Sequence, residues 1–533
     1  MKPAPSAADL GSRVSIRLHD PEGGFRDLLG HLVTINQVRK KNGQIITFDP
    51  DRIALWKIVP TTVLSTNIFL YDTKSRMTRE LTISDGKALR MYCCGPTVYR
   101  DAHVGNLRTF LLADLITRLV EIDGYAVRSI QNITDVGHLN EDFEGASDGE
   151  DKMLKQAHAL HVDPLTIARN YETNFHKDLE RLGVTTADIY PRASESIELM
   201  QRLIQQLIDS NHAYLGSDGT VYFAATTFQS YGAISGNRLD ALKPGHRYEY
   251  TGDGAKRFHA DWALWKSSGN RTEMVWDSPW GRGFPGWHIE CSAMSLHYLQ
   301  GHVDIHLGGI DLRFPHHENE RAQSNSGTLS EVTDHWVHGE HLLFEGRKMS
   351  KSAGNVVLLQ DVIDRGFDPL ALRLVFLENK YRSQMDLTWN QISAADSTLK
   401  RWRHKYQEWS TTELHNDPDV VKELCKEIFD FLRNDLDTPR ALIKLRAIER
   451  DPTLSSRSKI QLFDEVDRFF GLDIARVDPI NAIDKEVEEL LQLRLEARVV
   501  KDFPRSDELR DLLLQKKIRV HDDQGGQRWE VIP

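Results

Sequence analysis

The sequence lacks the features that mark membrane, exported and repetitive proteins. None of its 533 residues belongs to an apolar run of about 18 residues, the length that spans a bilayer. Residues 1–6 lead into a polar stretch without the apolar centre of a signal peptide. Internal repeats and low-complexity tracts are also missing. We therefore expect no membrane partner and no export, and cytoplasmic localisation is the prediction.

Cysteine is scarce, with four residues in the whole chain. So few thiols do not form a disulfide framework, and in a reducing compartment metal binding or catalysis is the expected role. The net charge of −11 argues against a general nucleic-acid-binding protein, although a local basic patch can still recognise RNA. The composition, 40% hydrophobic and 27% charged, is typical of a globular protein whose length predicts several domains.

The patterns along the chain predict domains of different kinds. Short alternating stretches with Gly-containing turns predict a small β-barrel-like domain at the start. Strand-like and helix-like stretches then alternate as in an α/β domain, with an insertion rich in Gly and Trp, and helical patterns follow up to a final hairpin. The predicted boundaries are 1–64 for the β domain, 65–330 for the α/β domain with its insertion at about 185–285, 331–375 for a mobile-loop region, 376–475 for a helical bundle and 476–533 for a small last domain.

One basic turn stands out in the first domain. Arg39, Lys40 and Lys41 follow one another there. They suit a phosphate contact, and an exposed hairpin tip is the alternative. The role of the whole domain stays open between an extra RNA contact, a protein-docking module and an inert extension.

Residues 92–106 join a thiol to the start of a helix. Cys94 lies nine residues ahead of His103, and the run His103-Val-Gly-Asn106 opens a stretch with helical spacing of apolar residues. Residues 88–93 are expected to form a buried strand, so the loop lies where a strand leads into a helix, the usual phosphate site of a doubly wound sheet. An ordinary glycine-containing turn with one buried cysteine is the alternative.

A second group of residues has the chemistry of a metal site. His316 and Glu320 are four residues apart and share a face if the segment is helical. With Cys94 and Cys291 they supply two thiolates, an imidazole and a carboxylate, which suits Zn²⁺. Each residue alone is weak evidence, because a buried cysteine is often packing and a histidine pair is often a helix cap. The substitutes that the sequence leaves open are His317, His288 and Cys93.

A third group, Glu345 to Asn355, gathers cations, hydroxyls and glycines into one predicted loop. Such a loop suits a triphosphate whose charge grows on the leaving pyrophosphate during transfer. A basic surface loop is the alternative, and the position of the segment at the far end of an α/β domain disfavours it.

These motifs carry a family resemblance. His103-Val-Gly-Asn106 with Lys348-Met-Ser-Lys-Ser352 resembles the two signature motifs of class I aminoacyl-tRNA synthetases. Further runs resemble the cysteinyl-tRNA synthetase family, and the likeness extends from about residue 65 to the C-terminus. They are Cys94-Gly-Pro-Thr-Val-Tyr99, Asn132-Ile-Thr-Asp135, Trp287-His-Ile-Glu-Cys291, Asp311-Leu-Arg-Phe-Pro-His-His-Glu-Asn-Glu320 and Tyr381-Arg-Ser-Gln384.

The resemblance implies a fold and a reaction. The fold would be α/β, a Rossmann-like class I synthetase catalytic domain with an insertion, followed by an α-helical bundle and an anticodon-binding domain. The reaction would be ATP-dependent ligation of cysteine to tRNA(Cys) through cysteinyl-adenylate, with Mg²⁺-bound ATP as substrate and one Zn²⁺ per chain. A monomer is the working expectation. No separate editing domain is expected, since zinc distinguishes a thiolate from a hydroxyl chemically.

The resemblance also implies roles for individual residues. Cys94, Cys291, His316 and Glu320 match zinc ligands, and Thr134, Trp287 and Asp311 match the cysteine pocket. ATP contacts are implied at Gly95, Thr97, His103, Gly105, Asn106 and Lys351, and catalytic roles at His103, Asn106, Lys348 and Lys351. Arg498, Phe503 and Asp507 match the tract that faces the anticodon.

Three departures from the family qualify the resemblance. Asn106 replaces the commoner His, and an amide donates a hydrogen bond but carries no positive charge. Phe503 stands where Trp is common, which keeps an aromatic face for base stacking. The first domain has no usual counterpart.

Two other functions compete with the ligase. One is an amide ligase that joins cysteine to an amino sugar, which the long helical tail disfavours. The other is a zinc-dependent RNA-binding protein without activity, which the complete motifs disfavour.

Overall fold

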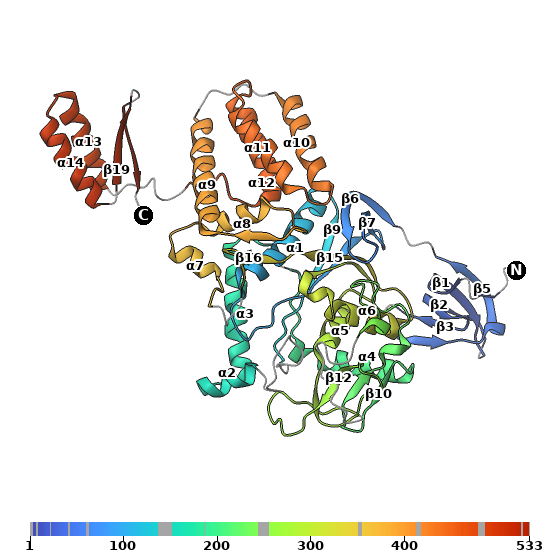
Figure 1. The fold of residues 1–533 in the computed structure, drawn as a ribbon. Coiled ribbons are helices and arrows are strands. Elements are labelled where there is room, and N and C mark those ends of the chain that lie inside the picture. Colours follow the sequence, from blue (N-terminus) through green and yellow to red (C-terminus); the bar gives the residue numbers. More distant parts are fainter. Residues whose placement is uncertain are drawn as a thin grey trace.

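The computed structural model describes residues 4–6, 9–21, 23–40, 43–59, 63–136, 152–185, 187–242, 255–349, 354–411, 417–477, 485–516, 518–523 and 526–531. Lys41 and Lys351 of the predictions lie outside these residues. No helix in this part of the chain is long and apolar enough to cross a membrane. Figure 1 shows a central body with a small domain at each end.

The N-terminal domain is an antiparallel sheet of five strands in the order β4-β3-β2-β1-β5. Along β1, inward and outward side chains alternate, and the inward ones pack on Phe48 and Trp56. Strands β4 and β5 are the two edges of this sheet. Among the described residues, no hydrogen-bonded pairing of β4 with β5 closes the sheet into the predicted barrel. The strands are β1 (Arg13–His19), β2 (Phe25–Thr34), β3 (Gln37–Arg39), β4 (Ile45–Thr47) and β5 (Ile53–Ile58), with a short 3-10 helix, η2 (Pro50–Arg52).

The central body contains a parallel sheet in the order β15-β14-β8-β9. The chain passes from β8 (Ala88–Cys93) through helix α1 (Val104–Ile122) to β9 (Ala126–Gln131) on one side. It returns later to form β14 (Val303–Gly309) on the other side of β8. The strand order therefore reverses between β8 and β14, and the crevice beyond their carboxyl ends is the usual ligand site of such sheets.

The predicted boundary at residue 330 is wrong in one respect. Strand β15 (Thr333–Gly339) pairs in parallel with β14 along its length. The sheet of the α/β domain therefore continues past residue 330. The partner strand comes this late in the chain because a parallel strand can join only after a long crossover connection.

The long connection between β9 and β14 forms a second layer. Its antiparallel sheet, in the order β10-β11-β12-β13, packs with α4 and α5 around Trp262, Trp265 and Phe223. The elements here are α2 (Lys152–Leu160), α3 (Pro164–Arg181), η4 (Ala193–Glu195), α4 (Ile197–Asp209), β10 (Ala213–Leu215), β11 (Val221–Phe223), η5 (Ala225–Thr227), η6 (Leu239–Ala241), β12 (Trp262–Ser267), β13 (Gly283–Pro285) and α5 (Trp287–Tyr298). After β14, η7 (Ile310–Arg313) and α6 (His316–Thr328) lead to β15. A hairpin of β6 (Leu64–Asp72) and β7 (Met77–Ile83) precedes the parallel sheet.

Helices dominate the rest of the chain. The bundle buries Phe463, Phe469 and Phe470 fully, and each such side chain contributes about 1.5–3 kcal/mol. The elements are β16 (Leu342–Phe344), β17 (Arg347–Lys348), α7 (Leu359–Asp364), α8 (Pro369–Leu377), β18 (Met385–Leu387), α9 (Trp389–Ser410), α10 (Pro418–Arg433), α11 (Thr438–Arg450) and α12 (Ser456–Phe470). The last domain comprises α13 (Lys485–Val499), α14 (Phe503–Gln515) and the hairpin β19 (Ile518–Asp523) with β20 (Gly526–Val531).

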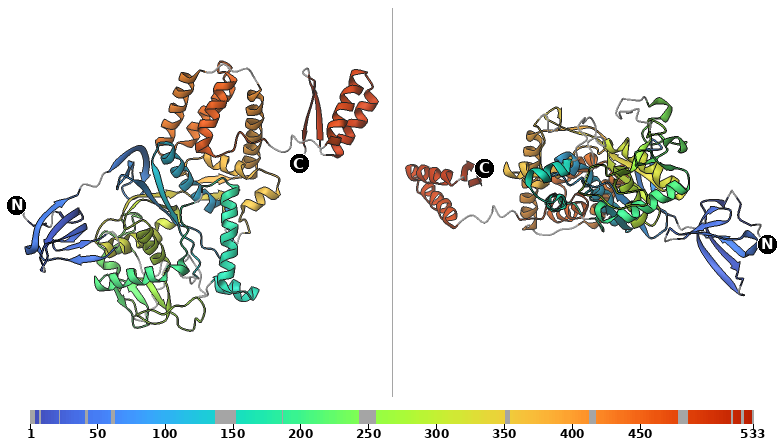
Figure 2. Two further views of the ribbon diagram at one scale, coloured as in Figure 1. Left: turned by 180° about the vertical axis from the view of Figure 1, so that it is seen from behind. Right: turned by 90° about the horizontal axis from the view of Figure 1, so that it is seen from below.

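A buried ion pair joins the body to the bundle. Arg373 of α8 binds Asp114 of α1 at 2.6 Å, and both side chains are inaccessible to solvent. Arg373 also donates to the carbonyl of Gly183 at 2.8 Å and to that of Phe470 at the end of α12. Removing one partner of such a pair costs about 3–5 kcal/mol, because the other charge stays buried. Figure 2 shows the bundle seated against the body, with the last domain beyond it.

Candidate active site

Cys94 leaves β8 at the carboxyl edge of the parallel sheet, beside the crevice between β8 and β14. Its main-chain N–H donates to the carbonyl of Leu307 in β14 at 3.1 Å. The next residue, Gly95, has no room for a side chain, since a Cβ there would lie 1.6 Å from the carbonyl oxygen of Asn132. Glycine thus lets the backbone after β8 pass close to that of Asn132.

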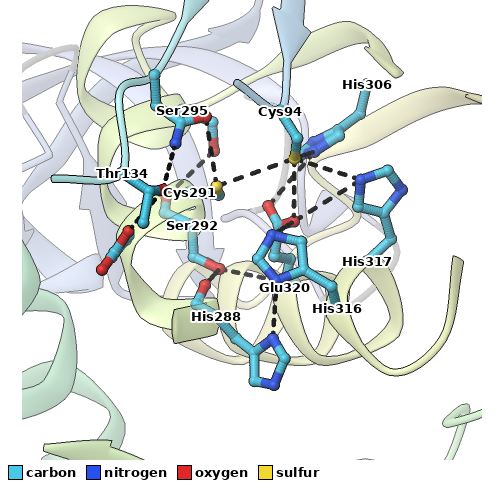
Figure 3. A network of polar contacts seen from close by, with 12 residues as sticks. Cys94, Thr134, His288, Cys291, Ser292, Ser295, His306, His316, His317 and Glu320 are labelled. Atoms are coloured by element: carbon cyan, nitrogen blue, oxygen red, sulfur yellow. Dashed lines mark hydrogen bonds and ion pairs between the residues drawn. The ribbon is translucent and has the colours of Figure 1, made fainter. Parts of the chain in front are cut away.

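The four residues predicted as metal ligands come together in one buried cluster (Figure 3). The Sγ atoms of Cys94 and Cys291 are 3.8 Å apart, and Cys94 Sγ lies 3.5 Å from Oε1 of Glu320. His316 Nε2 lies 2.9 Å from that same oxygen, as expected for residues four apart on α6. One donor atom from each of the four residues lies within 4.8 Å of every other.

A second set of donors overlaps the first. From Cys94 Sγ, the distance is 3.5 Å to Nε2 of His306 in β14 and 3.3 Å to Nε2 of His317 in α6. Together with Glu320, these residues also have donor atoms that all lie within 4.8 Å of one another. Of the other predicted substitutes, His288 contacts His316, with their Nδ1 atoms 2.9 Å apart. Cys93 faces away and its Sγ accepts from Gln131 Nε2 at 3.6 Å, because successive strand residues point to opposite sides.

The cluster is electrostatically unfavourable without a cation. Burial raises the pKa values of the Cys94 and Cys291 thiols and raises that of Glu320 to about 7, while burial lowers the pKa of His306 to about 4. Among the described residues, Oε2 of Glu320 accepts no hydrogen bond, although Nε2 of His306 lies 3.3 Å from it. A divalent cation would satisfy this oxygen and favour the thiolate and carboxylate forms, so these residues fit a zinc ion.

Another grouping of potential ligands is an ion-pair network rather than a metal site. His302 Nε2 lies 2.9 Å from Asp334 and 3.5 Å from Asp304. Asp304 is already occupied, because it also accepts from the main-chain N–H and the guanidinium of Arg90. The two carboxylates raise the pKa of His302 to about 9 against the effect of burial.

The three residues predicted for the amino-acid pocket border the cluster differently. The ring of Trp287 lies 4.2 Å from that of His316, centroid to centroid. Thr134 is buried and donates to Glu290 Oε2 at 3.0 Å (Figure 3). Asp311 lies in η7 and is exposed. Glu290, a buried residue that we did not predict, belongs to the motif Trp287-His-Ile-Glu-Cys291, whose spacing places it next to a predicted ligand.

His103 forms the N-cap of α1. Its Nδ1 accepts from the main-chain N–H groups of Gly105 and Asn106, at 3.1 and 3.3 Å, and Asn106 Oδ1 accepts in return from the main-chain N–H of His103. Burial and the nearby Arg100 lower the pKa of His103 to about 4. The neutral ring therefore carries its proton on Nε2, next to the positive end of a helix.

The second signature motif approaches the first. Lys348 ends β17, and Asn355 Nδ2 donates to its carbonyl at 3.1 Å. A Cβ on Gly105 would lie 3.1 Å from Cε of Met349, so the methionine packs on the start of α1. Thr97 pairs with Thr134 in a parallel bridge. Of the predicted nucleotide residues that are described, Gly95 and Thr97 thus follow β8, and His103, Gly105 and Asn106 lie at the start of α1.

Comparisons with known proteins agree with this geometry. The model of the class I (C) tRNA synthetase catalytic domain matches residues 80–397, more than half of the chain. The cysteine–tRNA ligase of Thermus thermophilus is 37% identical over 487 residues, which cover 87% of this chain and 99% of that one. Cysteine–tRNA ligase 1 of Burkholderia lata is 41% identical over 468 residues, covering 86% and 96%. The chain belongs to the cysteine–tRNA ligase family.

Family membership decides between two of the predicted functions. The relatives of this cysteine–tRNA ligase family named above are tRNA ligases, and nothing in them supports the amide-ligase alternative. The family model begins at residue 80, so the N-terminal β domain lies outside it.

The tract predicted to face the anticodon lies on the last domain of this family member. Phe503 begins α14 and is 56% exposed. Arg498 pairs with Asp522 of β19 at 3.1 Å, and Asp507 pairs with Arg510 at 3.2 Å. The structure places these three side chains on α13 and α14, far along the chain from the metal cluster.

Proposed function

We propose that this chain ligates cysteine to tRNA(Cys) with ATP. One observation carries the proposal. Two cysteines, a histidine and a glutamate converge at the carboxyl end of β8, the strand that leads into a helix whose N-cap is His103. A soft, sulfur-rich donor set beside a phosphate-binding helix terminus suits an enzyme that recognises a thiol and activates a carboxylate.

Cys94, Cys291, His316 and Glu320 are proposed to hold one zinc ion. The overlapping set replaces one thiolate with a second imidazole, and zinc favours the set with two thiolates in a closed protein site. His288 contacts His316 as an outer partner of a ligand does, and His338 contacts His317 in the same way at 2.9 Å, so the choice rests on the two thiolates. When bound, zinc would prefer a substrate thiolate to a hydroxyl, which stays protonated near pH 7.

The amino acid would lie between this cluster and the sheet. Thr134 and Trp287 border the cluster, and Asp311 extends from η7 toward solvent. These positions support a pocket in which Thr134 orients the substrate. The Thr134 hydroxyl donates to Glu290 and accepts from Nδ2 of Asn132 at 3.0 Å, which leaves one lone pair of the hydroxyl as an acceptor.

ATP would bind across the start of α1 with magnesium. The cysteine carboxylate oxygen attacks the α-phosphorus, the bond from this phosphorus to the bridging oxygen breaks, and pyrophosphate leaves. The N–H groups at the helix start and Nε2–H of His103 favour the growing negative charge, and Lys348 and Lys351 add positive charge. Gly95, Thr97, Gly105 and Asn106 are proposed to contact the same nucleotide. The protein thus contributes position and electrostatics and no nucleophile.

The second step uses tRNA. A hydroxyl oxygen of the terminal ribose attacks the carbonyl carbon of cysteinyl-adenylate, and AMP leaves. Arg498, Phe503 and Asp507 are proposed to contact the anticodon, and the exposure of Phe503 supports base stacking there. A monomer suffices for this arrangement, since each proposed contact comes from one chain.

Two assays on the zinc-loaded full chain test the proposal. Pyrophosphate exchange into ATP should depend on cysteine and ignore serine. Charging of total tRNA with radiolabelled cysteine should then follow. Exchange without charging would favour the amide ligase, and zinc-dependent RNA binding without exchange would favour a non-enzymatic protein.

A further inference from the structure

We propose that Arg108 is a positioning residue that holds the two halves of the nucleotide site in register. One half is the start of α1 with His103, and the other is the base of the loop that begins at Lys348. The inference rests on the proposed function, in which both halves contact ATP.

Arg108 is the fifth residue of α1 and is 6% exposed. Its guanidinium donates four hydrogen bonds, and all four acceptors are main-chain carbonyl oxygens. Nη1 donates to Glu340 at 2.9 Å and to His341 at 3.3 Å, and Nη2 donates to Lys380 and to Ser383, each at 2.9 Å. The planar group thus spans two separate segments of chain.

These segments start the strands that support the Lys348 loop. Glu340 and His341 immediately precede β16, which turns back as β17 and ends at Lys348. Lys380 and Ser383 precede β18, which pairs in parallel with β16. The main-chain N–H of Glu340 donates to Tyr381 at 2.8 Å. Arg108 therefore fastens the origin of both strands to α1.

The far side of the loop rests on the same helix. The main-chain N–H of Val104 donates to the carbonyl of Val357 at 3.0 Å, and His103 pairs with Leu358. Met349 packs on Gly105. Met349 and Val357, near the two ends of the segment from Lys348 to Leu358, thus both contact the start of α1. Arg108 fixes the strands that lead into this segment.

The chemistry of arginine suits this task. Burial lowers the pKa of Arg108 to about 10, which shows how far the charge is withdrawn from water. A buried cation is tolerated when its hydrogen bonds are satisfied, and the rigid fork of five donors fixes the directions of two pairs of carbonyls. Lysine presents a compact ammonium with three donors and cannot reproduce that geometry. Displacement of a reacting group by about 1 Å costs about 100-fold in rate.

The test compares Arg108→Lys and Arg108→Gln with Arg118→Lys in the zinc-loaded full chain. Arg118 lies on the same helix and binds Asp114 and the carbonyl of Gly183, without contacting the loop base. Single-turnover adenylate formation at saturating cysteine and ATP should fall about 10- to 100-fold in both Arg108 variants. Zinc content and the apparent affinity for cysteine should stay within about twofold, and Arg118→Lys should keep the wild-type rate.

Hydrogen exchange provides a measurement that needs no activity. Amides of residues 342–348 and 385–387 should exchange faster in Arg108→Gln than in Arg118→Lys, while amides of β8 should not differ. Unchanged exchange in these strands, or unchanged single-turnover rates in a folded Arg108→Lys, would overturn the proposal. If both arginine variants lose rate in proportion to thermal stability, the role is structural and the proposal fails. If the wild-type protein showed no cysteine-dependent pyrophosphate exchange, the proposed function would be rejected instead. Hydrogen exchange would still test whether Arg108 holds the two strands in place.

Discussion

The metal-capable cluster and the tract proposed to face the anticodon differ in how their side chains are arranged. Around Cys94, buried donors from β8, α5 and α6 point toward one another within a few ångströms. Around Phe503, the side chains are exposed on α13 and α14, and their charges pair locally. Small-molecule chemistry needs converging, desolvated groups, whereas a large polyanion can be contacted by a surface. The two regions should therefore fail separately when altered.

The largest effect is expected at the metal cluster. Cys291→Ser should abolish zinc binding and cysteine-dependent pyrophosphate exchange together, by more than about 100-fold, because even outer partners of metal ligands are worth about 10- to 100-fold. Metal analysis and the exchange assay measure both. His306→Gln is the matched control, since His306 belongs only to the overlapping donor set. Zinc loss in His306→Gln with full zinc in Cys291→Ser would assign the metal to that other set.

The second signature motif, Lys348 to Ser352, should show a large effect on rate alone. Lys351→Ala should slow single-turnover adenylate formation about 100- to 1,000-fold with little change in cysteine affinity, because its ammonium is assigned to charge that develops on the leaving phosphates. Lys57→Ala, an exposed lysine of the N-terminal domain, serves as control. A normal rate in Lys351→Ala would remove this lysine from the catalytic step.

The C-terminal tract should affect tRNA alone. Truncation before about residue 480 should preserve pyrophosphate exchange and sharply reduce charging. Phe503→Ala should raise the apparent KM for tRNA about 5- to 150-fold, the equivalent of about 1–3 kcal/mol for a stacked base. Leu512→Ala, another exposed apolar residue of α14, is the control. Normal charging by the truncated chain would contradict an anticodon role for the C-terminal tract. The functional contrast between the two regions would then be lost.

The smallest effect on activity is expected from His302, which lies before the amino end of β14 and contributes to stability. The pKa of His302 is about 9 in the folded chain and 6.5 as its ordinary value, so its ion pairs stabilise fully below pH 6.5 and are lost as pH rises through 9. The contribution is about 3.5 kcal/mol at most, from a shift of about 2.5 pKa units at about 1.4 kcal/mol per unit. Thermal unfolding should therefore separate wild type from His302→Gln more at pH 6 than at pH 9.5. Equal separation at both values would show that His302 is not held protonated.

Local patterns predicted much of the fold. Residues 88–93 form β8 as expected, and the helical spacing that begins at Asn106 lies within α1. The spacing of His316 and Glu320 predicted their shared helix face because four residues make about one turn. The end of the α/β domain was misplaced, since the pairing of β15 with β14 depends on a distant strand.

The sequence by itself determined the elements and the chemical character of the site, because helix and strand periods and side-chain donors are local properties. Only the tertiary structure decided which donors meet. Cys94, Cys291 and Glu320 are far apart in the chain and converge because the order of parallel strands reverses between β8 and β14. The carbonyls that Arg108 binds could not be predicted from the sequence either. Every residue has a main-chain carbonyl, and only the path of the folded chain decides which of them Arg108 contacts.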